Sequence, residues 1–287
     1  MTLSKVYKTL TDILNKAHIS DAENDAFLLM ESILHIKHIH LTSDPEREIC
    51  EKDFETLLLM CQRRAKGEPL QYITGCWEFY GRKYYVGEGV LIPRDDTEVV
   101  LRSTFPFLDK LKEKKDIKIL DLCSGSGILA ITLKLLYPKA QVTAVEISDS
   151  AVEYLRRNAE ENCADIRIIH DDIFACVESF EDGEFDLIIS NPPYVTPEDM
   201  ENLQKEVTFE PSLALAGGGE DGCDFYRRII PLYTPKLRDG GMLAFEYDAQ
   251  QAFIIKDLME KKNYSQISIF DDLGGVHRAI NGTVHKI

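Results

Sequence analysis

From about residue 116 onward, short apolar runs alternate with stretches of helical periodicity, and this alternation limits the fold more than any other feature. The runs are IKILDL (117–122), QVTAVEI (141–147), IRIIH (166–170), FDLIIS (185–190) and GMLAFE (241–246). Strands that alternate with helices predict a parallel α/β sheet with both faces covered. Residues 265–282 are typical of two strands joined by a Gly-Gly turn, a common closing hairpin on such a sheet.

The N-terminal part of the chain has a different pattern. Apolar residues recur at helical spacing, as in Val6, Leu10 and Leu14, so we expect helices there. A Gly- and aromatic-rich stretch with short β-type runs follows and predicts a hairpin. We therefore divide the chain into a helical domain (1–75), a β-hairpin linker (76–93) and an α/β domain (94–287).

Charge and composition exclude several classes of protein. The net charge of −16 disfavours stable nucleic-acid binding, because binding to the phosphate backbone needs a basic face. No run approaches the roughly 18 apolar residues of a membrane span, and the N-terminus lacks a signal core, so we expect a cytoplasmic protein without membrane contact. Seven scattered cysteines form no C-x-x-C pair, and nothing completes a ligand set around HIKHIH (35–40), so we expect no metal site.

A glycine loop follows the first strand of the α/β domain. The strand ends in Asp121, and Cys123, Ser124, Gly125, Ser126 and Gly127 lead into a helical stretch. Glycines at such a turn let a ligand approach the backbone closely. Glu146, at the end of the second strand, can accept hydrogen bonds from ribose hydroxyls, and Asp172 and Ile173, after the third, can hold an adenine.

Two other interpretations of the glycine loop stay open: a purely structural turn and a nicotinamide dinucleotide fold. The dinucleotide fold expects G-x-G-x-x-G around a pyrophosphate. Here the loop has only G-x-G after an acid, Asp121, which suits the amino group of a methionine moiety better. We therefore favour S-adenosylmethionine, a methyl donor, as the cofactor.

The fourth strand runs into Asn191-Pro192-Pro193-Tyr194. Proline has no N–H for a strand ladder, so the strand must stop there, which a plain proline turn would also explain. The Asn191 side-chain oxygen and nearby carbonyl oxygens are acceptors that can bind both hydrogens of a planar NH2 group, and Tyr194 offers it a flat face. Such a group is a poor nucleophile, so positioning and electrostatics dominate its methylation. Glutamine and asparagine amides and the amino groups of adenine and cytosine all fit the motif.

These motifs together resemble the HemK family of protein N5-glutamine methyltransferases, which modify peptide-chain release factors. The resemblance runs nearly end to end and includes EPLQYITG (68–75), FYG (79–81), VLIPR (90–94), DTE (96–98), the glycine loop, Asn191–Tyr194, Glu210-Pro211 and AGGGEDG (216–222). It departs from the family at Cys123-Ser124, where many members have Gly-Thr, and at Tyr247-Asp248, where Ile-Gly is usual.

The resemblance implies a class I, Rossmann-like methyltransferase sheet, preceded by a helical domain that docks the release factor and by the hairpin linker. It implies the glutamine of a Gly-Gly-Gln motif as the substrate. For the methyl donor, the resemblance implies by position that Cys123–Gly127 form the loop around it, that Glu146 binds the ribose, and that Asp172 and Ile173 line the adenine. For the substrate, it implies that the amide is held by Asn191, Pro192, Pro193 and Tyr194, and that Arg94 forms part of the wall of the cleft. Asn191 is expected at both the methyl donor and the amide, with Asn191, Pro192 and Tyr194 as the catalytic residues.

Three alternatives remain from the sequence: a ribosomal-protein glutamine methyltransferase, a nucleic-acid amino methyltransferase, and a non-catalytic binding module of the same fold. We expect the chain to act as a monomer.

Overall fold

The computed structural model describes residues 1–114 and 116–286 and divides the chain into two compact units. The first comprises Met1–Cys76 together with the later segment Gln204–Phe209, and the second comprises Trp77–Leu203 and the chain from Glu210 onward.

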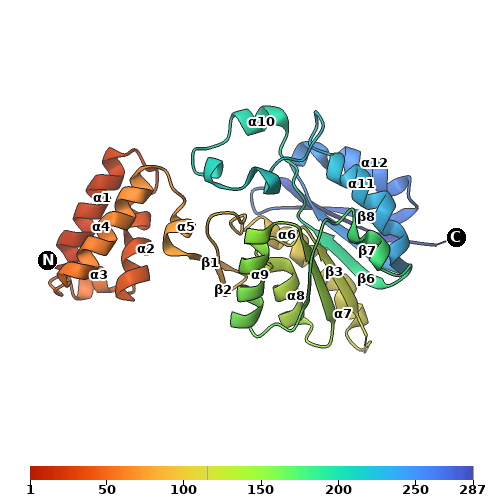
Figure 1. The fold of residues 1–287 in the computed structure, drawn as a ribbon, viewed down its shortest axis with the longest axis horizontal. Coiled ribbons are helices and arrows are strands. Elements are labelled where there is room, and N and C mark those ends of the chain that lie inside the picture. The colour runs from red at the N-terminus through yellow and green to blue at the C-terminus, as the bar shows by residue number, and fades with distance from the viewer. Residues whose placement is uncertain (115, 287) are drawn as a thin grey trace. The chain divides into compact units, whose positions relative to one another are not determined.

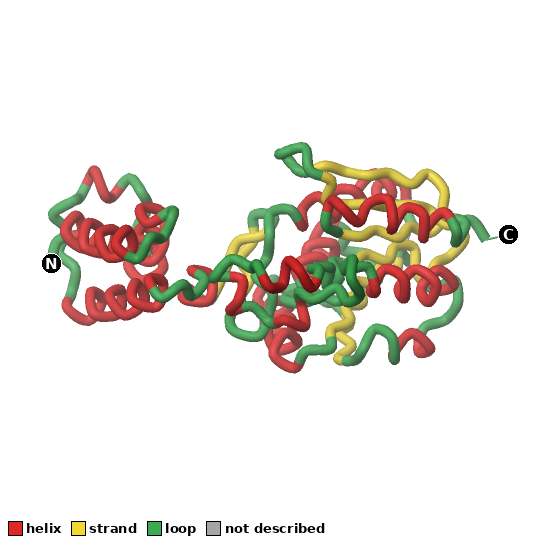
Figure 2. Tube along the Cα trace, turned by 90° about the horizontal axis from the view of Figure 1, so that it is seen from above, coloured by secondary structure: helices red, strands yellow, loops and turns green. Residues whose placement is uncertain are grey.

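The first unit is built of helices and loops (Figure 2). Its helices are α1 (Leu3–Lys16), α2 (Ala22–Leu34), α3 (His40–Ser43), α4 (Glu51–Ala65), α5 (Leu70–Thr74) and the 3-10 helix η2 (Val207–Phe209). On α1, Leu3, Val6, Leu10 and Leu14 are fully buried, which is the predicted helical spacing of a core face. α5 ends at Gly75, whose φ of 76° is the left-handed conformation that glycine adopts without a steric cost.

A buried arginine joins three parts of the first unit. Arg64 on α4 is only 5% exposed, and its Nε donates to Asp25 Oδ2 on α2 at 2.5 Å. Its Nη1 donates to the carbonyl of Glu68 at 3.1 Å, and its Nη2 to Glu206 Oε1 at 2.6 Å. Glu206 lies in the segment 204–209, so this charged contact ties a late part of the chain to the N-terminal helices.

The second unit contains a seven-stranded sheet in the order β5-β4-β3-β6-β7-β9-β8. Strands β3, β6, β7 and β8 of this sheet are labelled in Figure 1. Its strands are β3 (Lys118–Leu122), β4 (Gln141–Glu146), β5 (Arg167–His170), β6 (Phe185–Ser190), β7 (Leu237–Glu246), β8 (Tyr264–Asp271) and β9 (His277–Val284). Strands β3 to β7 pair in parallel, and β9 pairs antiparallel with β7 and β8. Two further strands, β1 (Cys76–Phe79) and β2 (Arg82–Tyr85), form a separate small sheet.

Both faces of the large sheet are covered, because successive side chains of a strand point to opposite faces. Leu120 of β3 and Leu243 of β7 pack in one core cluster, whereas Ile119 and Ala244 pack in the other. Helices α11 (Asp224–Tyr233) and α12 (Ala252–Glu260) cover the first face, and α6 (Thr97–Ser103), α7 (Phe105–Leu111), α8 (Ile128–Leu136) and α9 (Asp149–Glu161) cover the second. The remaining short helices are α10 (Pro197–Glu201), η1 (Cys176–Ser179), η3 (Ser212–Ala214), η4 (Thr234–Lys236) and η5 (Ala249–Gln251).

The predicted α/β fold class is confirmed, with one difference in β7. The apolar run in the sequence predicts a strand over residues 241–246. In the structure β7 begins at Leu237 and runs through these residues, with Gly240 at a φ of 73° and a register shift against β6. Such a bulge absorbs extra residues without ending the strand.

Neither a membrane span nor a metal site is found in the residues that the structure describes. No helix there is long and apolar enough to cross a bilayer. No group of three or more His, Cys, Asp and Glu residues in 1–114 and 116–286 is arranged to hold a metal ion.

Candidate active site

A cavity lies in the second unit where the parallel strands reach their carboxyl ends, the edge at which open α/β sheets bind ligands. Four strand ends contribute lining residues: Cys123, Ser124, Gly125 and Ser126 after β3; Glu146 and Ile147 at β4; Asp172, Ile173 and Phe174 after β5; and Asn191 and Pro193 after β6. Arg94 also lines it. Four other predicted site residues, Asp121, Gly127, Pro192 and Tyr194, lie outside the lining.

Three alternate residues of the glycine loop have left-handed backbone conformations. Cys123, Gly125 and Gly127 have φ values of 58°, 55° and 87°. A Cβ at Gly127 would lie 2.3 Å from Leu155 Cδ1, so this glycine permits close packing of the loop against α9. A Cβ at Gly125 would meet no atom of the described residues within 4 Å, so the backbone there is open to a ligand.

Asp121 supports this loop from beneath. It is fully buried, and its Oδ2 accepts hydrogen bonds from the Ser124 hydroxyl and, at 3.1 Å, from the Ala130 N–H. Burial raises the pKa of Asp121 to about 7, against the effect of these two hydrogen bonds. The side chain therefore orders the turn into α8.

Glu146 faces the cavity from the end of β4. Its Oε2 accepts from the Gly125 N–H at 2.7 Å, and its Oε1 accepts from the N–H groups of Ile147 and Ser148 at 3.0 and 2.8 Å. These three contacts fix the carboxylate and leave about one of its four lone-pair positions, on Oε2, for a ribose hydroxyl.

The wall after β5 combines a carboxylate with aromatic surface. Asp172 Oδ1 accepts from the Phe174 N–H at 2.8 Å, and Ile173 is buried. The Phe174 ring lies 5.6 Å from that of Phe225, and the Arg228 guanidinium lies 3.3 Å from the Phe174 ring centroid. Phe225 and Arg228 both line the cavity from α11, and no motif in the sequence marks them.

Asn191 is held by a neighbour that the sequence motifs include only as part of DTE. Its Nδ2 donates to the Thr97 hydroxyl at 3.3 Å, and Thr97 is buried at the start of α6. The amide orientation is thereby set, and the side-chain oxygen is the atom that remains to accept hydrogen bonds.

Tyr194 is linked to Glu246, a residue that sequence reasoning placed only at the end of a strand. The Tyr194 hydroxyl donates to Glu246 Oε1 at 3.3 Å, and the pKa of Tyr194 is raised by burial and by that carboxyl. Glu246 is 1% exposed, and burial raises its pKa to about 7, while a hydrogen bond with Thr97 acts in the opposite direction. The signal available in the sequence was that Glu246 ends the predicted strand 241–246, as Asn191 follows the strand 185–190. In the structure Ser190 pairs in parallel with Phe245, which places the next residues, Asn191 and Glu246, at the same edge of the sheet.

Arg94 forms an ion pair with Glu210, which is buried and also accepts from the Ile92 N–H at 2.9 Å through Oε2. One carboxylate thus joins the VLIPR segment to the chain after residue 209, and both segments line the cavity.

Comparisons with known proteins match both units. The profile of the PrmC N-terminal domain matches residues 5–75, and that of the methyltransferase small domain matches residues 101–220. A release factor glutamine methyltransferase of Chlorobaculum tepidum is 35% identical over 283 residues, covering 96% of this chain and 95% of its own length. The chain belongs to the release factor glutamine methyltransferase family. The resemblance seen in the motifs is confirmed.

Another release factor glutamine methyltransferase, from Geobacter sulfurreducens, is 34% identical over 284 residues and covers 99% of this chain and 97% of itself. Among solved structures, the hMettl16 catalytic domain in complex with a hairpin of the MAT2A 3'UTR aligns with a TM-score of 0.56 at 12% identity, covering 91% of this chain and 93% of that one. This second similarity is one of fold.

Proposed function

We propose that this chain transfers a methyl group from S-adenosylmethionine to the side-chain amide nitrogen of the glutamine in the Gly-Gly-Gln motif of peptide-chain release factors. Relatives named release factor glutamine methyltransferase match this chain over almost its whole length. The observation that carries the proposal is the position of Asn191, whose amide lies at the cavity with its nitrogen bound to Thr97.

The residues around the cavity fit the methyl donor. Gly125 leaves open space beside its backbone, Glu146 offers a fixed carboxylate for a ribose hydroxyl, and Asp172 with Ile173 offers a polar edge and an apolar face for an adenine. When bound, S-adenosylmethionine supplies an electrophilic methyl group on a positively charged sulfur.

The acceptor amide needs help from the protein, because resonance draws the nitrogen lone pair into the carbonyl. We assign Asn191 Oδ1 and the Pro192 carbonyl as acceptors of the two amide hydrogens, with Pro193 and Tyr194 shaping the site. Hydrogen bonds to both protons hold electron density at nitrogen and fix its direction. After methylation the nitrogen carries a positive charge and loses one proton readily, so no strong base is needed.

The proposal extends to the partners. We assign docking of the release factor to the helical unit and place the reaction in the cytoplasm, where translation ends. The protein acts as a monomer on a protein substrate, and its net charge of −16 opposes stable binding to nucleic acid.

The test is mass spectrometry of a purified release factor after incubation with this protein and S-adenosylmethionine. We expect one added methyl group on the Gly-Gly-Gln glutamine. Parallel reactions contain ribosomal proteins or nucleic acid with a labelled methyl donor. The proposal is contradicted if label appears only in ribosomal proteins or only in nucleic acid, or if none of the three substrates is methylated.

A further inference from the structure

The loop Asn191–Tyr194 has few backbone groups that could hold it in place, because two of its four residues are prolines. Ser190 is the last residue before it that is held by the sheet, through the pairing of β6 with β7 and a 2.7 Å hydrogen bond to the Leu122 carbonyl. Pro192 and Pro193 have no N–H groups, so they cannot anchor the loop as donors. The first backbone that can hold its far end is that of Tyr194 and Val195.

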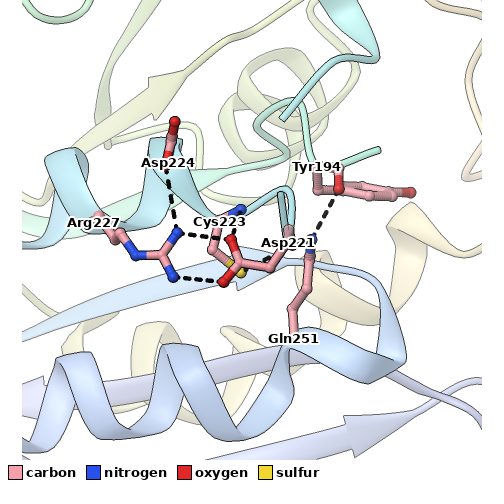
Figure 3. Close-up of polar contacts among 6 residues, drawn as sticks. All are labelled: Tyr194, Asp221, Cys223, Asp224, Arg227 and Gln251. Carbon is pink, nitrogen blue, oxygen red and sulfur yellow. Dashed lines mark hydrogen bonds and ion pairs between the residues drawn. The ribbon is translucent and has the colours of Figure 1, made fainter. Parts of the chain in front are cut away.

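The four backbone polar groups of Tyr194 and Val195 are all bound. The N–H groups of Tyr194 and Val195 donate to the Leu215 carbonyl at 3.1 and 2.8 Å, and the Val195 carbonyl accepts from Gly217 N–H at 3.0 Å. These three contacts are between backbone atoms. The fourth group, the Tyr194 carbonyl, accepts from the side chain of Gln251 at 2.8 Å (Figure 3).

Gln251 is buried, and its side-chain amide is fully hydrogen-bonded. It is 3% exposed, and its Nε2 also donates to the Asp221 carbonyl at 3.0 Å. Its Oε1 accepts from the Asp248 N–H at 3.2 Å, inside a capping box at the start of η5. Both the donors and the acceptor of the amide are therefore used, and the side chain connects three segments of the second unit.

The glycine run 217–222 forms the surface against which Tyr194 packs. A Cβ at Gly222 would lie 2.2 Å from the Tyr194 carbonyl oxygen and 2.7 Å from Gln251 Nε2, and a Cβ at Gly217 would lie 2.6 Å from Tyr194 Cα. The run is held in turn by Asp221, whose carboxylate binds Arg227 through both oxygens at 2.7 and 2.6 Å (Figure 3). Glycine is required here because the backbone of Tyr194 approaches so closely.

We propose that Gln251 is a positioning residue for the methylation reaction, which fixes the far end of the loop Asn191–Tyr194 through the Tyr194 carbonyl. The inference rests on the proposed function of that loop. Gln251 itself touches neither the cavity nor the reacting atoms, and it acts by keeping the amide acceptors of the loop at their places.

The test compares Gln251→Glu with Gln250→Glu, the same change at the exposed neighbouring residue. In Gln251→Glu the two N–H donors are lost and carboxylate oxygens face two carbonyls. We expect kcat for the release factor to fall about 100-fold, as for misplacement of reacting groups by about 1 Å. The KM for the release factor and the Kd for S-adenosylmethionine should stay within about threefold of the wild type, and Gln250→Glu should behave as the wild type.

A second pair of variants keeps the inference testable if Gln251→Glu does not fold. Gly222→Ala and Gly240→Ala introduce a Cβ at similar left-handed φ values, 69° and 73°. The new Cβ meets the Tyr194 carbonyl at Gly222, whereas at Gly240 it has no neighbour within 4 Å in the part of the chain that the structure describes. We expect kcat to fall in Gly222→Ala alone.

The outcomes separate the two proposals. A wild-type protein that does not methylate a release factor overturns the proposed function and this inference with it. An active wild type together with a kcat within threefold of wild type in Gln251→Glu, or in Gly222→Ala if Gln251→Glu is unfolded, overturns the inference alone. Parallel loss of S-adenosylmethionine affinity also contradicts it, because a general structural defect would produce that result.

Discussion

Tyr194 and Glu246 are joined by a 3.3 Å hydrogen bond from the tyrosine hydroxyl to a carboxyl that is almost completely buried. The second oxygen of Glu246, Oε2, has no hydrogen-bond partner among residues 1–114 and 116–286. A charged carboxylate in this environment is costly, so the neutral form is favoured up to an unusually high pH.

The first prediction concerns the charge of Glu246. Its pKa rises from 4.5 to about 7, chiefly through burial, with Asp96 adding to the shift and Thr97, Tyr194 and Arg278 opposing it. Between these two values the folded protein holds a proton that the unfolded chain has released. The stability from this group is therefore complete below about pH 4.5 and is lost as the pH rises through about 7.

The measurement is the free energy of unfolding in urea at several pH values for the wild type and Glu246→Gln. From about pH 5 to 7.5 the wild type should lose up to about 3 kcal/mol relative to the variant. Asp121, whose pKa is also raised, is present in both proteins and cancels in this difference. A difference that does not change with pH contradicts the prediction.

The second prediction concerns Asn191. In Asn191→Ala the acceptor for one amide hydrogen is lost, so kcat for the release factor should fall at least about 100-fold, as when one preorganised polar group is removed from an active site. Isothermal titration with S-adenosylmethionine should give a Kd close to that of the wild type. Equal loss of methyl-donor affinity would place Asn191 at the cofactor alone.

The third prediction concerns Glu146. Replacing its carboxylate by an amide in Glu146→Gln weakens the charge-assisted contacts, which are worth about 1.5–3 kcal/mol each. The Kd for S-adenosylmethionine should rise by roughly 10- to 100-fold. Glu153→Gln, an exposed change on α9, is the control. Unchanged affinity in Glu146→Gln would mean that the carboxylate only supports the glycine loop.

The fourth prediction concerns Asn158 on α9, which is fully buried. It accepts from the Tyr85 N–H at 2.6 Å and donates to the carbonyls of Tyr85 and Ser126 at 3.0 and 2.9 Å, so it links the hairpin strand β2 to the glycine loop. Asn158→Ala leaves these backbone groups unpaired and should destabilise the protein by about 2–4 kcal/mol.

Asn162→Ala, one turn later and half-buried, removes contacts of 3.2 Å to the Lys83 carbonyl and 3.0 Å to the Asn158 carbonyl and should cost only about 1 kcal/mol. Chemical unfolding of both variants measures the difference. Similar losses of unfolding free energy in the two variants would contradict the proposed structural role of Asn158.

Local patterns predict the fold and the strand ends of the site because their physical causes are local. Apolar runs predict buried parallel strands, and the residue types at strand ends predict where Glu146, Asp172 and Asn191 gather. The structure agrees with the fold, and it brings these three residues to one cavity.

The supports of the site could not be predicted in the same way. Gln251 reaches a carbonyl 57 residues earlier, and Asn158 reaches one 73 residues earlier. In the sequence both are ordinary helix-associated polar residues, and only tertiary packing decides what an amide side chain meets. Arg228 likewise becomes part of a cavity wall because α11 turns that face toward Phe174.

The contact between Arg64 and Glu206 has a consequence for anyone who wishes to study the two units separately. Cutting the gene after residue 76 would give an N-terminal fragment whose buried guanidinium lacks one of its two carboxylates, because Glu206 would remain on the other fragment. The helical unit would therefore be better produced with the 204–209 peptide supplied in trans or fused through a short linker.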